Sequence, residues 1–358
     1  MSSNPEFLYL SHSRLHRNRA NLLQTLHTLA ALTVQGIKTA IYLPPWHSGT
    51  EPVARLAAFG IDVPLDLRSS PWLHRRWPPD FFALWHRRRL LNTPAVYVRA
   101  PRISLALARL GIAHHLEIHT LRALQMSGQL APLIAHHRAG QIRTLLPISA
   151  TAAQALIAAG AVPERIHVSP SGVDVARFGA VPALDPARLA RPRLLYVGSV
   201  SADRGLPLFA ALASDDSLTI TLVGSAPPGP LAERLHYRPP VPHREVPALY
   251  QEADLVLLPY QPELEHADAI SPLKLFEAMA AGRPIVASDI PPLREILRDR
   301  ENALLVPPRD VNAWRIAIKT LRTDPALAIR LAETARREAQ AYDWRTRAAR
   351  IARAIGLR

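Results

Sequence analysis

Residues 270–288 read ISPLKLFEAMAAGRPIVAS, and this stretch predicts a helix that leads directly into a strand. Ser271 is a good N-cap residue, and Pro272 suits the first position of a helix. The predicted apolar stripe of the helix consists of Leu273, Phe276, Met279 and Ala280. Gly282 ends the helix, and Pro284 begins the strand. A helix joined to a short apolar strand is the repeating unit of an α/β protein.

Similar short apolar runs, separated by stretches with helical spacing, occur along the whole chain. In the first half they lie at 7–10, 37–43, 95–98, 113–118 and 145–148, and in the second half at 194–198, 218–223, 255–258, 284–287 and 303–306. Such runs are typical of parallel sheets covered by helices on both faces. The sequence therefore predicts an α/β protein with two Rossmann-like, doubly wound parallel-sheet domains that face a cleft.

The chain of 358 residues is too long for one ordinary core and suits two. A stretch rich in Ala, Pro and Arg interrupts the alternation of strands and helices and indicates a linker. We therefore predict a first domain at 1–172, a linker at 173–192 and a second domain at 193–342.

The composition excludes several classes of protein. The chain has no cysteine, so it has no disulfide framework, no thiolate metal site and no cysteine nucleophile. No apolar run approaches the roughly 18 residues that a bilayer-spanning helix needs. The start of the chain lacks the basic and apolar regions of a signal peptide. We therefore expect a cytoplasmic protein.

The net charge is +14, and its basic residues are dense in the segment 68–90, where Trp72, Trp77 and Trp85 lie among arginines. Aromatic rings with guanidinium groups are typical of a membrane headgroup region, but a solvated basic helix with its rings in the core has the same composition. We predict that the first domain binds a glycan or lipid-linked acceptor, and one hypothesis is that 68–90 contacts the inner face of an anionic membrane. No motif for specific nucleic-acid binding accompanies the charge.

The start of the helix within 270–288 has the features of an anion site. Free N–H groups and the positive end of the helix dipole lie there, with Lys274 in the first turn. Glu277 follows three residues later on the same helix face. A nucleoside diphosphate would suit this spacing, with its phosphates on the N–H groups and Lys274 and its ribose hydroxyls on Glu277. The alternative is a Lys–Glu surface pair on an ordinary helix.

The same residues resemble the donor-site helix of GT-B retaining glycosyltransferases of family 4, also called group 1. Further segments resemble the family's motifs in the family's order: Glu117-Ile118-His119, Pro170-Ser171-Gly172-Val173-Asp174, Tyr196-Val197-Gly198, Arg204-Gly205 and 302–308. The resemblance implies a GT-B fold and transfer of a hexose-type sugar from a nucleotide sugar, with retention and without a metal or other cofactor. It also implies that the last helix, 343–358, packs back on the first domain.

The resemblance assigns roles to individual residues. The implied donor-binding residues are Gly198, Arg204, Ser271, Pro272, Leu273, Lys274 and Glu277. The predicted catalytic residues are His119 and Glu117: His119 would contact the donor sugar near the reacting carbon, and Glu117 would orient neighbouring groups or cap a helix. A metal site on this strand is disfavoured, because residues alternating along one strand give poor tetrahedral geometry.

Three points stay open at the level of the sequence. Ser11 either makes a minor donor contact or caps a solvated helix start, and Arg204 is either a diphosphate cation or a solvated residue. The family often has Glu where this chain has Ala269, which leaves open how the donor sugar's hydroxyls are held. The alternative functions are a GT-B nucleotide-sugar epimerase and a non-catalytic protein that binds glycans or nucleic acid.

Overall fold

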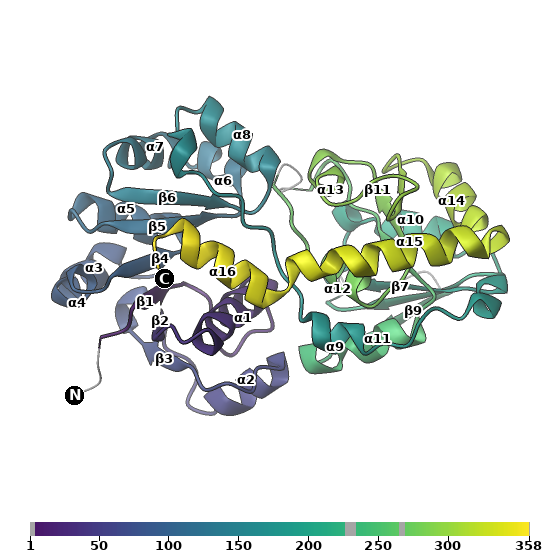
Figure 1. The fold of residues 1–358 in the computed structure, drawn as a ribbon, viewed down its shortest axis with the longest axis horizontal. Coiled ribbons are helices and arrows are strands. Elements are labelled where there is room, and N and C mark those ends of the chain that lie inside the picture. Colours follow the sequence, from purple (N-terminus) through teal and green to yellow (C-terminus); the bar gives the residue numbers. More distant parts are fainter. Residues whose placement is uncertain (1–3, 226–233, 265–268, 358) are drawn as a thin grey trace. The chain divides into compact units, whose positions relative to one another are not determined.

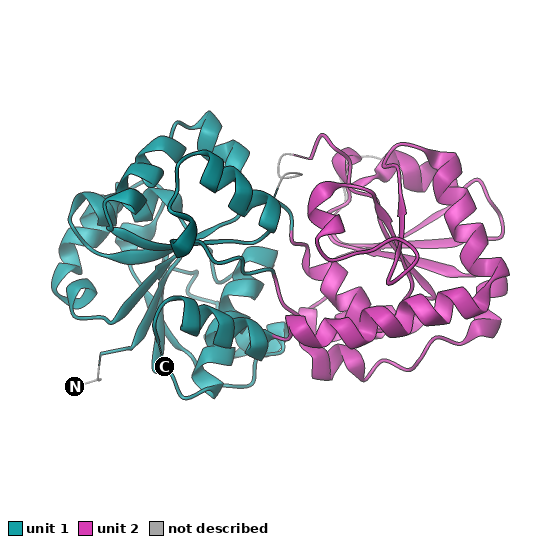
Figure 2. Cartoon of the chain, turned by 45° about the horizontal axis from the view of Figure 1, so that its top comes forward, with its two compact units in different colours: residues 1–170, 268–270, 344–358 teal, residues 171–267, 271–343 magenta. Residues whose placement is uncertain are grey.

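The computed structural model describes residues 4–225, 234–264 and 269–357. The chain forms two compact units (Figure 2). Unit 1 consists of 1–170, 268–270 and 344–358, and unit 2 consists of 171–267 and 271–343. Each unit contains one sheet of six parallel strands with helices packed against it (Figure 1). The predicted α/β class, with two doubly wound parallel sheets, is confirmed.

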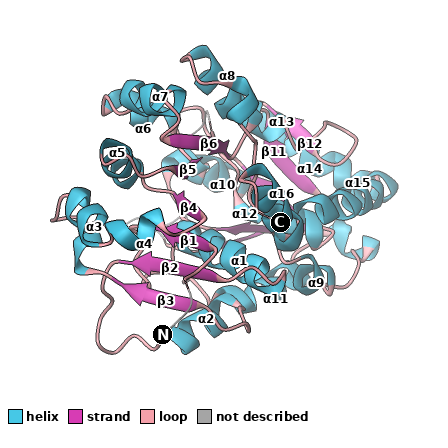
Figure 3. Cartoon of the chain, turned by 60° about the vertical axis from the view of Figure 1, so that its left-hand side comes forward, coloured by secondary structure: helices cyan, strands magenta, loops and turns pink. Residues whose placement is uncertain are grey.

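The sheet of unit 1 has the strand order β3-β2-β1-β4-β5-β6 (Figure 3). Its strands are β1 (Phe7–Leu10), β2 (Thr39–Leu43), β3 (Asp66–Ser69), β4 (Ala95–Val98), β5 (His114–Ile118) and β6 (Ile142–Pro147). Its α-helices are α1 (Ala20–Val34), α2 (Pro52–Phe59), α3 (Pro79–Trp85), α4 (Arg87–Leu91), α5 (Pro101–Arg109), α6 (Leu121–Met126), α7 (Leu130–Arg138), α8 (Ala150–Ala158) and α16 (Trp344–Ala354).

Side chains of β1 alternate between the two faces of this sheet, as the period of two in a strand requires. Leu8 and Leu10 lie in an apolar core with Phe82 of α3. Tyr9 belongs to the other face, where Thr25 of α1 donates a hydrogen bond to its hydroxyl at 3.3 Å. Helix α1 packs against α16, so the end of the chain covers this second face (Figure 1).

The sheet of unit 2 has the order β12-β11-β10-β7-β8-β9. Its strands are β7 (Arg193–Val197), β8 (Thr219–Val223), β9 (Leu235–Arg238), β10 (Leu255–Leu258), β11 (Ile285–Ser288) and β12 (Leu304–Val306). Its α-helices are α9 (Val175–Gly179), α10 (Leu206–Leu212), α11 (Val246–Glu252), α12 (Leu273–Ala280), α13 (Pro291–Arg294), α14 (Val311–Thr323) and α15 (Pro325–Glu338). Leu194 and Tyr196 pack with Phe209 of α10 and Trp314 of α14 in its core.

The structure differs from the sequence prediction in three places. The strands β3 and β9 were not predicted, because neither has a continuous apolar run; both are edge strands, and most of their side chains are half-buried or exposed. The stretch 173–192 is not an open linker, since it forms α9 and a 3₁₀ helix (Pro186–Ala190) within unit 2. Helical apolar spacing extends over 14–35 of the sequence, but the helix itself begins only at Ala20.

None of the helices in the described part of the chain has both the length and the apolar character that a bilayer crossing requires.

Candidate functional site

Helix α12 begins at Leu273, one residue later than the sequence predicts. Pro272 has extended backbone angles and occupies the N-cap position, where no side chain caps the helix. Ser271 is therefore not the predicted N-cap: its hydroxyl accepts the N–H of Ser171 at 2.9 Å instead. Among the described residues, nothing accepts a hydrogen bond from the N–H groups of Leu273 and Lys274. The first turn of α12 thus keeps donors for a ligand.

The ammonium group of Lys274 lies against aromatic rings rather than beside a carboxylate. Its Nζ is 3.7 Å from the ring centre of Tyr196 and 5.7 Å from that of Tyr260. No carboxylate of residues 4–225, 234–264 and 269–357 makes an ion pair with it. Burial, and then the charge of Arg204, lower the pKa of Lys274 well below its usual range. A bound anion would supply the missing negative charge.

Two glycines let the backbone come close to this ammonium. Gly198, directly after β7, has φ +139°, and a Cβ built on it would lie 2.3 Å from Nζ of Lys274. Gly224, directly after β8, has φ +150°, and a Cβ there would lie 1.9 Å from the carbonyl oxygen of Gly198. Any larger residue at either position would displace its neighbour. The glycines therefore bring the ends of β7 and β8 and the start of α12 together.

Glu277 is buried one turn into α12 and does not pair with Lys274. His243 donates to one carboxylate oxygen at 2.8 Å, and the hydroxyl of Tyr250 donates to the other at 3.2 Å. The alternative of a Lys–Glu surface pair is therefore wrong. Each carboxylate oxygen has a second lone pair, so Glu277 can still accept from a ligand hydroxyl.

Arg204 lies in a 3₁₀ helix (Ala202–Arg204) after β7. Its guanidinium donates to the hydroxyl of Ser201 at 3.1 Å and makes an ion pair with Asp203 at 3.5 Å. The side chain is about one third exposed, so it is not locked in the core. Its charge nevertheless acts on Lys274, which means that two cations share this edge of the sheet.

Glu117 of β5 has a buried carboxylate with several partners in unit 1. The amide of Gln24 donates to one oxygen at 3.1 Å, and the hydroxyl of Tyr97 donates to the other at 2.6 Å. Arg347 of α16 makes an ion pair with it at 3.2 Å. Burial alone would raise the pKa of Glu117, but the surrounding positive charge, first that of Arg347, holds this pKa well below its usual range.

Arg347 is itself fully buried and ties α16 to unit 1. Its guanidinium donates to the carbonyl of Pro170 at 2.8 Å and to the hydroxyl of Thr28 at 2.6 Å, in addition to its pair with Glu117. A buried guanidinium is tolerated only with such a set of partners. The predicted packing of the last helix on the first domain therefore has a polar anchor.

His119, directly after β5, has a defined tautomer. Arg99 donates to its Nδ1 at 3.1 Å, and a guanidinium has no acceptor, so the ring proton must lie on Nε2. Nε2 donates this proton to Glu117. Burial, and then the charge of Arg99, lower the pKa of His119 to about 4. In this arrangement His119 is a neutral ring with both nitrogens engaged, not a free general base.

The remaining predicted contributor, Ser11, follows β1 in unit 1. It is buried, and its hydroxyl accepts the N–H of Ser13 at 3.1 Å, so it shapes its own loop. In the described part of the chain no group of three or more histidines and carboxylates is arranged to hold a metal ion.

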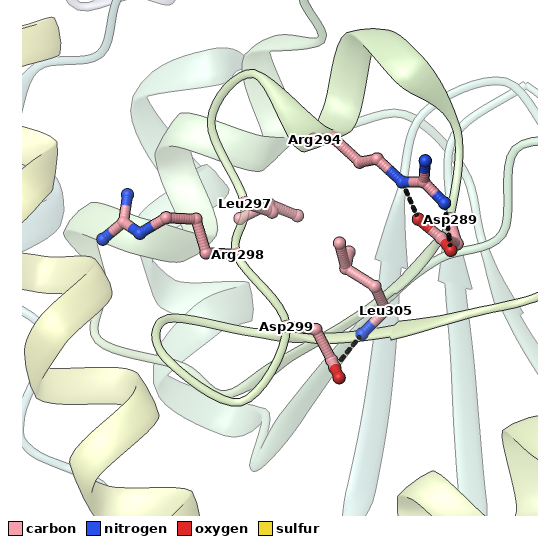
Figure 4. A pocket seen from close by; sticks show the side chains of 6 residues that line it. All are labelled: Asp289, Arg294, Leu297, Arg298, Asp299 and Leu305. Carbon is pink, nitrogen blue, oxygen red and sulfur yellow. Dashed lines mark hydrogen bonds and ion pairs between the residues drawn. The ribbon is translucent and has the colours of Figure 1, made fainter.

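A hollow of about 390 Å³ lies elsewhere in unit 2, around the end of β11 (Figure 4). Arg294 pairs with Asp289 at 2.6 Å, and Asp299 accepts the N–H of Leu305 at 2.9 Å. These polar groups already have partners, and the hollow contains none of the predicted site residues.

Sequence reasoning missed the residues that surround the predicted ones. Tyr196 lies in the motif segment 196–198, and Tyr250 lies in 246–250, which also resembles the family; these positions could have indicated that both rings face the site. Arg99 and Arg347 had no such signal, because an arginine among forty says nothing about burial. Their roles follow only from contacts between distant parts of the chain.

Residues 191–324 match the family described as Glycosyl transferases group 1. This segment, a little over a third of the chain, is therefore similar to the group 1 glycosyltransferases. The matched residues include β7, the start of α12 and both glycines of the site. The expected resemblance to this family is confirmed.

Curated relatives of the family match about half of the chain. D-inositol 3-phosphate glycosyltransferase of Xylanimonas cellulosilytica is 29% identical over 212 residues, which are 52% of this chain and 49% of the relative. Glycogen synthase of Mycobacterium tuberculosis is 30% identical over 202 residues, 51% of this chain and 46% of the relative. The chain thus spans about half the length of the relatives that it matches.

Solved structures match nearly the whole chain. The structure of Anabaena Alr3699/HepE in complex with UDP and glucose has a TM-score of 0.74 at 18% identity and covers 98% of this chain and 99% of that one. Sucrose-phosphate synthase from Thermosynechococcus elongatus has a TM-score of 0.75 at 19% identity, with 97% of each chain covered. These likenesses show the GT-B fold.

Proposed function

We propose that the chain is a glycosyltransferase that moves a hexose-type sugar from a nucleotide sugar to a glycan or lipid-linked acceptor, with retention of configuration and without a metal. One observation carries this proposal: the ammonium of Lys274 has no carboxylate partner among the described residues at the start of α12, in the unit that contains the matched segment. A partly buried cation with open N–H groups beside it is a site for phosphate.

The chemistry of the leaving group explains this arrangement. Breaking the bond between sugar and diphosphate leaves negative charge on the phosphate oxygens, and fixed donors placed there lower the barrier. Lys274 and the N–H groups of the first turn of α12 would take this charge, and Arg204 would join them after leaving Asp203. Glu277, which keeps lone pairs beside His243 and Tyr250, would accept from the ribose hydroxyls.

The finer parts of the proposal rest on separate observations. Metal independence is supported by the sequence, which has no Asp-x-Asp triplet to bridge a metal and a diphosphate. Retention rests on the resemblance to the family's retaining members. Two observations support an acceptor with an anionic group. The first domain has a basic composition, and the name of one relative includes inositol 3-phosphate. The cytoplasmic location stays a prediction.

Calorimetry with UDP and with GDP on the full chain tests the central claim. UDP comes first, because HepE was solved with UDP and glucose. We expect binding of one of the two nucleotides. If neither nucleotide produces heat, the non-catalytic alternative is favoured and the proposal fails.

A panel of nucleotide sugars then identifies the reaction. A transferase slowly releases the intact sugar when water replaces the acceptor, whereas an epimerase changes the sugar's configuration. Product analysis by NMR separates these outcomes and reports the anomeric configuration. Chelator added to the same assay should leave the rate unchanged, and a loss of activity would contradict metal independence.

A further inference from the structure

The segment 71–91 of unit 1 contains apolar side chains in two different environments. Leu73, Phe82 and Leu90 are buried in the core. In contrast, Trp77, Phe81, Leu84 and Trp85 are 37%, 46%, 54% and 74% exposed; we call these four residues the aromatic patch. The alternative that the aromatic rings of this segment lie in the core is therefore correct for Phe82 but not for the aromatic patch.

The aromatic patch is continuous. Trp72, which is half-buried, has its ring centre 5.4 Å from that of Trp77, 5.5 Å from that of Phe81 and 6.3 Å from that of Trp85. Phe81, Leu84 and Trp85 are three and four residues apart on α3, so they lie on one face of that helix. Helix α3 packs on α5, which fixes the patch on the unit.

Arginines precede and follow the aromatic patch along the chain. Arg75 and Arg76 come before it and Arg87 and Arg88 after it; all four are exposed, and none pairs with a carboxylate of the described residues. Asp80 is the only acidic residue in 67–109, and Arg109 pairs with it at 2.7 Å. The surroundings of the patch therefore have a net positive charge that no carboxylate of the described residues neutralises.

We propose that the aromatic patch and these four arginines dock the chain on an anionic lipid bilayer. Tryptophan rings are favoured at the boundary between headgroups and acyl chains, where the indole N–H stays hydrated while the ring is buried. Arginines near the surface bind anionic headgroups. A patch with partly exposed indole rings, flanked along the chain by exposed arginines, matches this surface in both charge and polarity. The inference does not depend on the transferase activity.

Sedimentation of the full chain with vesicles tests the proposal. We expect binding to vesicles of phosphatidylcholine mixed with phosphatidylglycerol, and much weaker binding to phosphatidylcholine alone. Raising the salt concentration should weaken the binding. Brominated acyl chains should quench tryptophan fluorescence, and Trp85→Ala should lose part of that quenching.

Matched variants separate the patch from general charge and apolarity. Replacing Arg87 and Arg88 by Gln should lower the affinity for the mixed vesicles roughly 30-fold. Replacing Arg330 and Arg353, which are also exposed and unpaired among the described residues, gives the same net charge and should change the affinity less than threefold or so. Trp85→Ala should weaken binding, whereas Met126→Ala, at a residue that is 79% exposed, should not.

Three results would overturn the proposal. The first is no binding to the mixed vesicles at low salt. The second is an equal effect of both arginine pairs, because binding would then follow net charge only. The third is RNA binding or dimerisation that requires Trp85 while vesicle binding does not. Nucleotide calorimetry on the same variants should be unchanged, so failure here is distinguishable from failure of the proposed function.

Discussion

Glu117 in unit 1 and Lys274 in unit 2 are both charged side chains withdrawn from water, but their surroundings differ. Glu117 has hydrogen bonds from Gln24 and Tyr97 and an ion pair with Arg347. Lys274 has aromatic rings and a glycine backbone around it and no carboxylate partner among the described residues. The charge of Glu117 is paired within the fold, whereas the charge of Lys274 has no such partner in the part of the chain that the structure describes.

The difference separates a structural charge from a binding charge. Removing a partner from a satisfied buried pair leaves an uncompensated ion and destabilises the protein. Removing an unpaired charge relieves desolvation and weakens only what binds to it. Variants of the two regions should therefore change different measured quantities.

The largest expected effect follows from removing the partner of Glu117. Arg347→Met keeps about the same side-chain volume but removes the nearer of the two guanidinium groups paired with Glu117 and leaves only Arg99, at 3.8 Å, so we expect a loss of about 3 kcal/mol in the free energy of unfolding. Urea denaturation measures this loss. Arg353→Met on the same helix is the control and should change the stability by less than about 0.5 kcal/mol.

A second substitution sharpens this result. In the Arg347→Met background, Glu117→Gln replaces the charge by a neutral amide, so part of the lost stability should return. If Arg347→Met alone is as stable as the control, the buried pair does not stabilise unit 1.

The pH dependence of stability is expected to come from buried histidines of unit 1. Burial lowers the pKa of His114, His115 and His119 from 6.5 to about 4, about 3 and about 4. The unfolded chain takes up these protons near pH 6.5, but the folded chain does so only near pH 3–4. Stability should therefore fall as the pH drops from about 6.5 toward 4, by about 1 kcal/mol per histidine at one pH unit below 6.5.

Urea denaturation at about pH 7.5 and about pH 5.5 measures this slope, at a pH above the range in which most carboxylates titrate. His236→Gln removes an exposed histidine of unit 2 and should leave the slope unchanged. A flat profile between the two pH values would contradict the burial of neutral rings.

The effect of Lys274→Ala should appear in binding and not in stability. We expect nucleotide affinity to fall by about 1–3 kcal/mol, because a charged hydrogen bond to phosphate is lost. The free energy of unfolding should stay the same or rise, since an unpaired ammonium is removed. Calorimetry and urea denaturation on one sample measure both, with Lys319→Ala at an exposed position as the control. A large loss of stability would show that Lys274 has a structural role.

The smallest effect concerns the serine pair that holds the start of α12. Ser271 accepts the N–H of Ser171 at 2.9 Å, and the hydroxyl of Ser171 donates to the carbonyl of Ser271 at 2.6 Å. Each Ser→Ala substitution should destabilise by about 0.5–1.5 kcal/mol. A double-mutant cycle should give a coupling energy between the two positions; strictly additive losses would argue that the bonds act separately.

The sequence predicted the central strands and one edge strand of each sheet, β6 and β12, but missed the other edge strands, β3 and β9. Central parallel strands are buried on both faces and read as apolar runs, as Phe7–Leu10 and Leu255–Leu258 do. Edge strands need no such run, and Asp66–Ser69 has exposed residues at both of its ends. A continuous apolar run therefore identifies a strand only where both faces of that strand are buried.

The residues of the candidate site also fall into those that the sequence predicted and those that it did not. Residues that are adjacent in the sequence predicted that Lys274 lies in the first turn of a helix and that Gly198 follows a strand. The partners of Glu277 and Glu117 could not be predicted, because His243 and Arg347 lie 34 and 230 residues away from them along the chain. Local sequence patterns carry no information on such distant contacts.

The return of α16 to unit 1 constrains how the protein can be made. The guanidinium that neutralises Glu117 belongs to the last fifteen residues of the chain, so a ribosome has synthesised all of unit 2 before unit 1 can be completed. Until Arg347 has been synthesised, the nascent first half must either stay partly unfolded or keep the carboxylate of Glu117 protonated or hydrated. For the same reason, a recombinant fragment that stops at residue 170 would be a poor source of folded unit 1, whereas one that joins 344–358 to it through a short spacer would restore the missing charge.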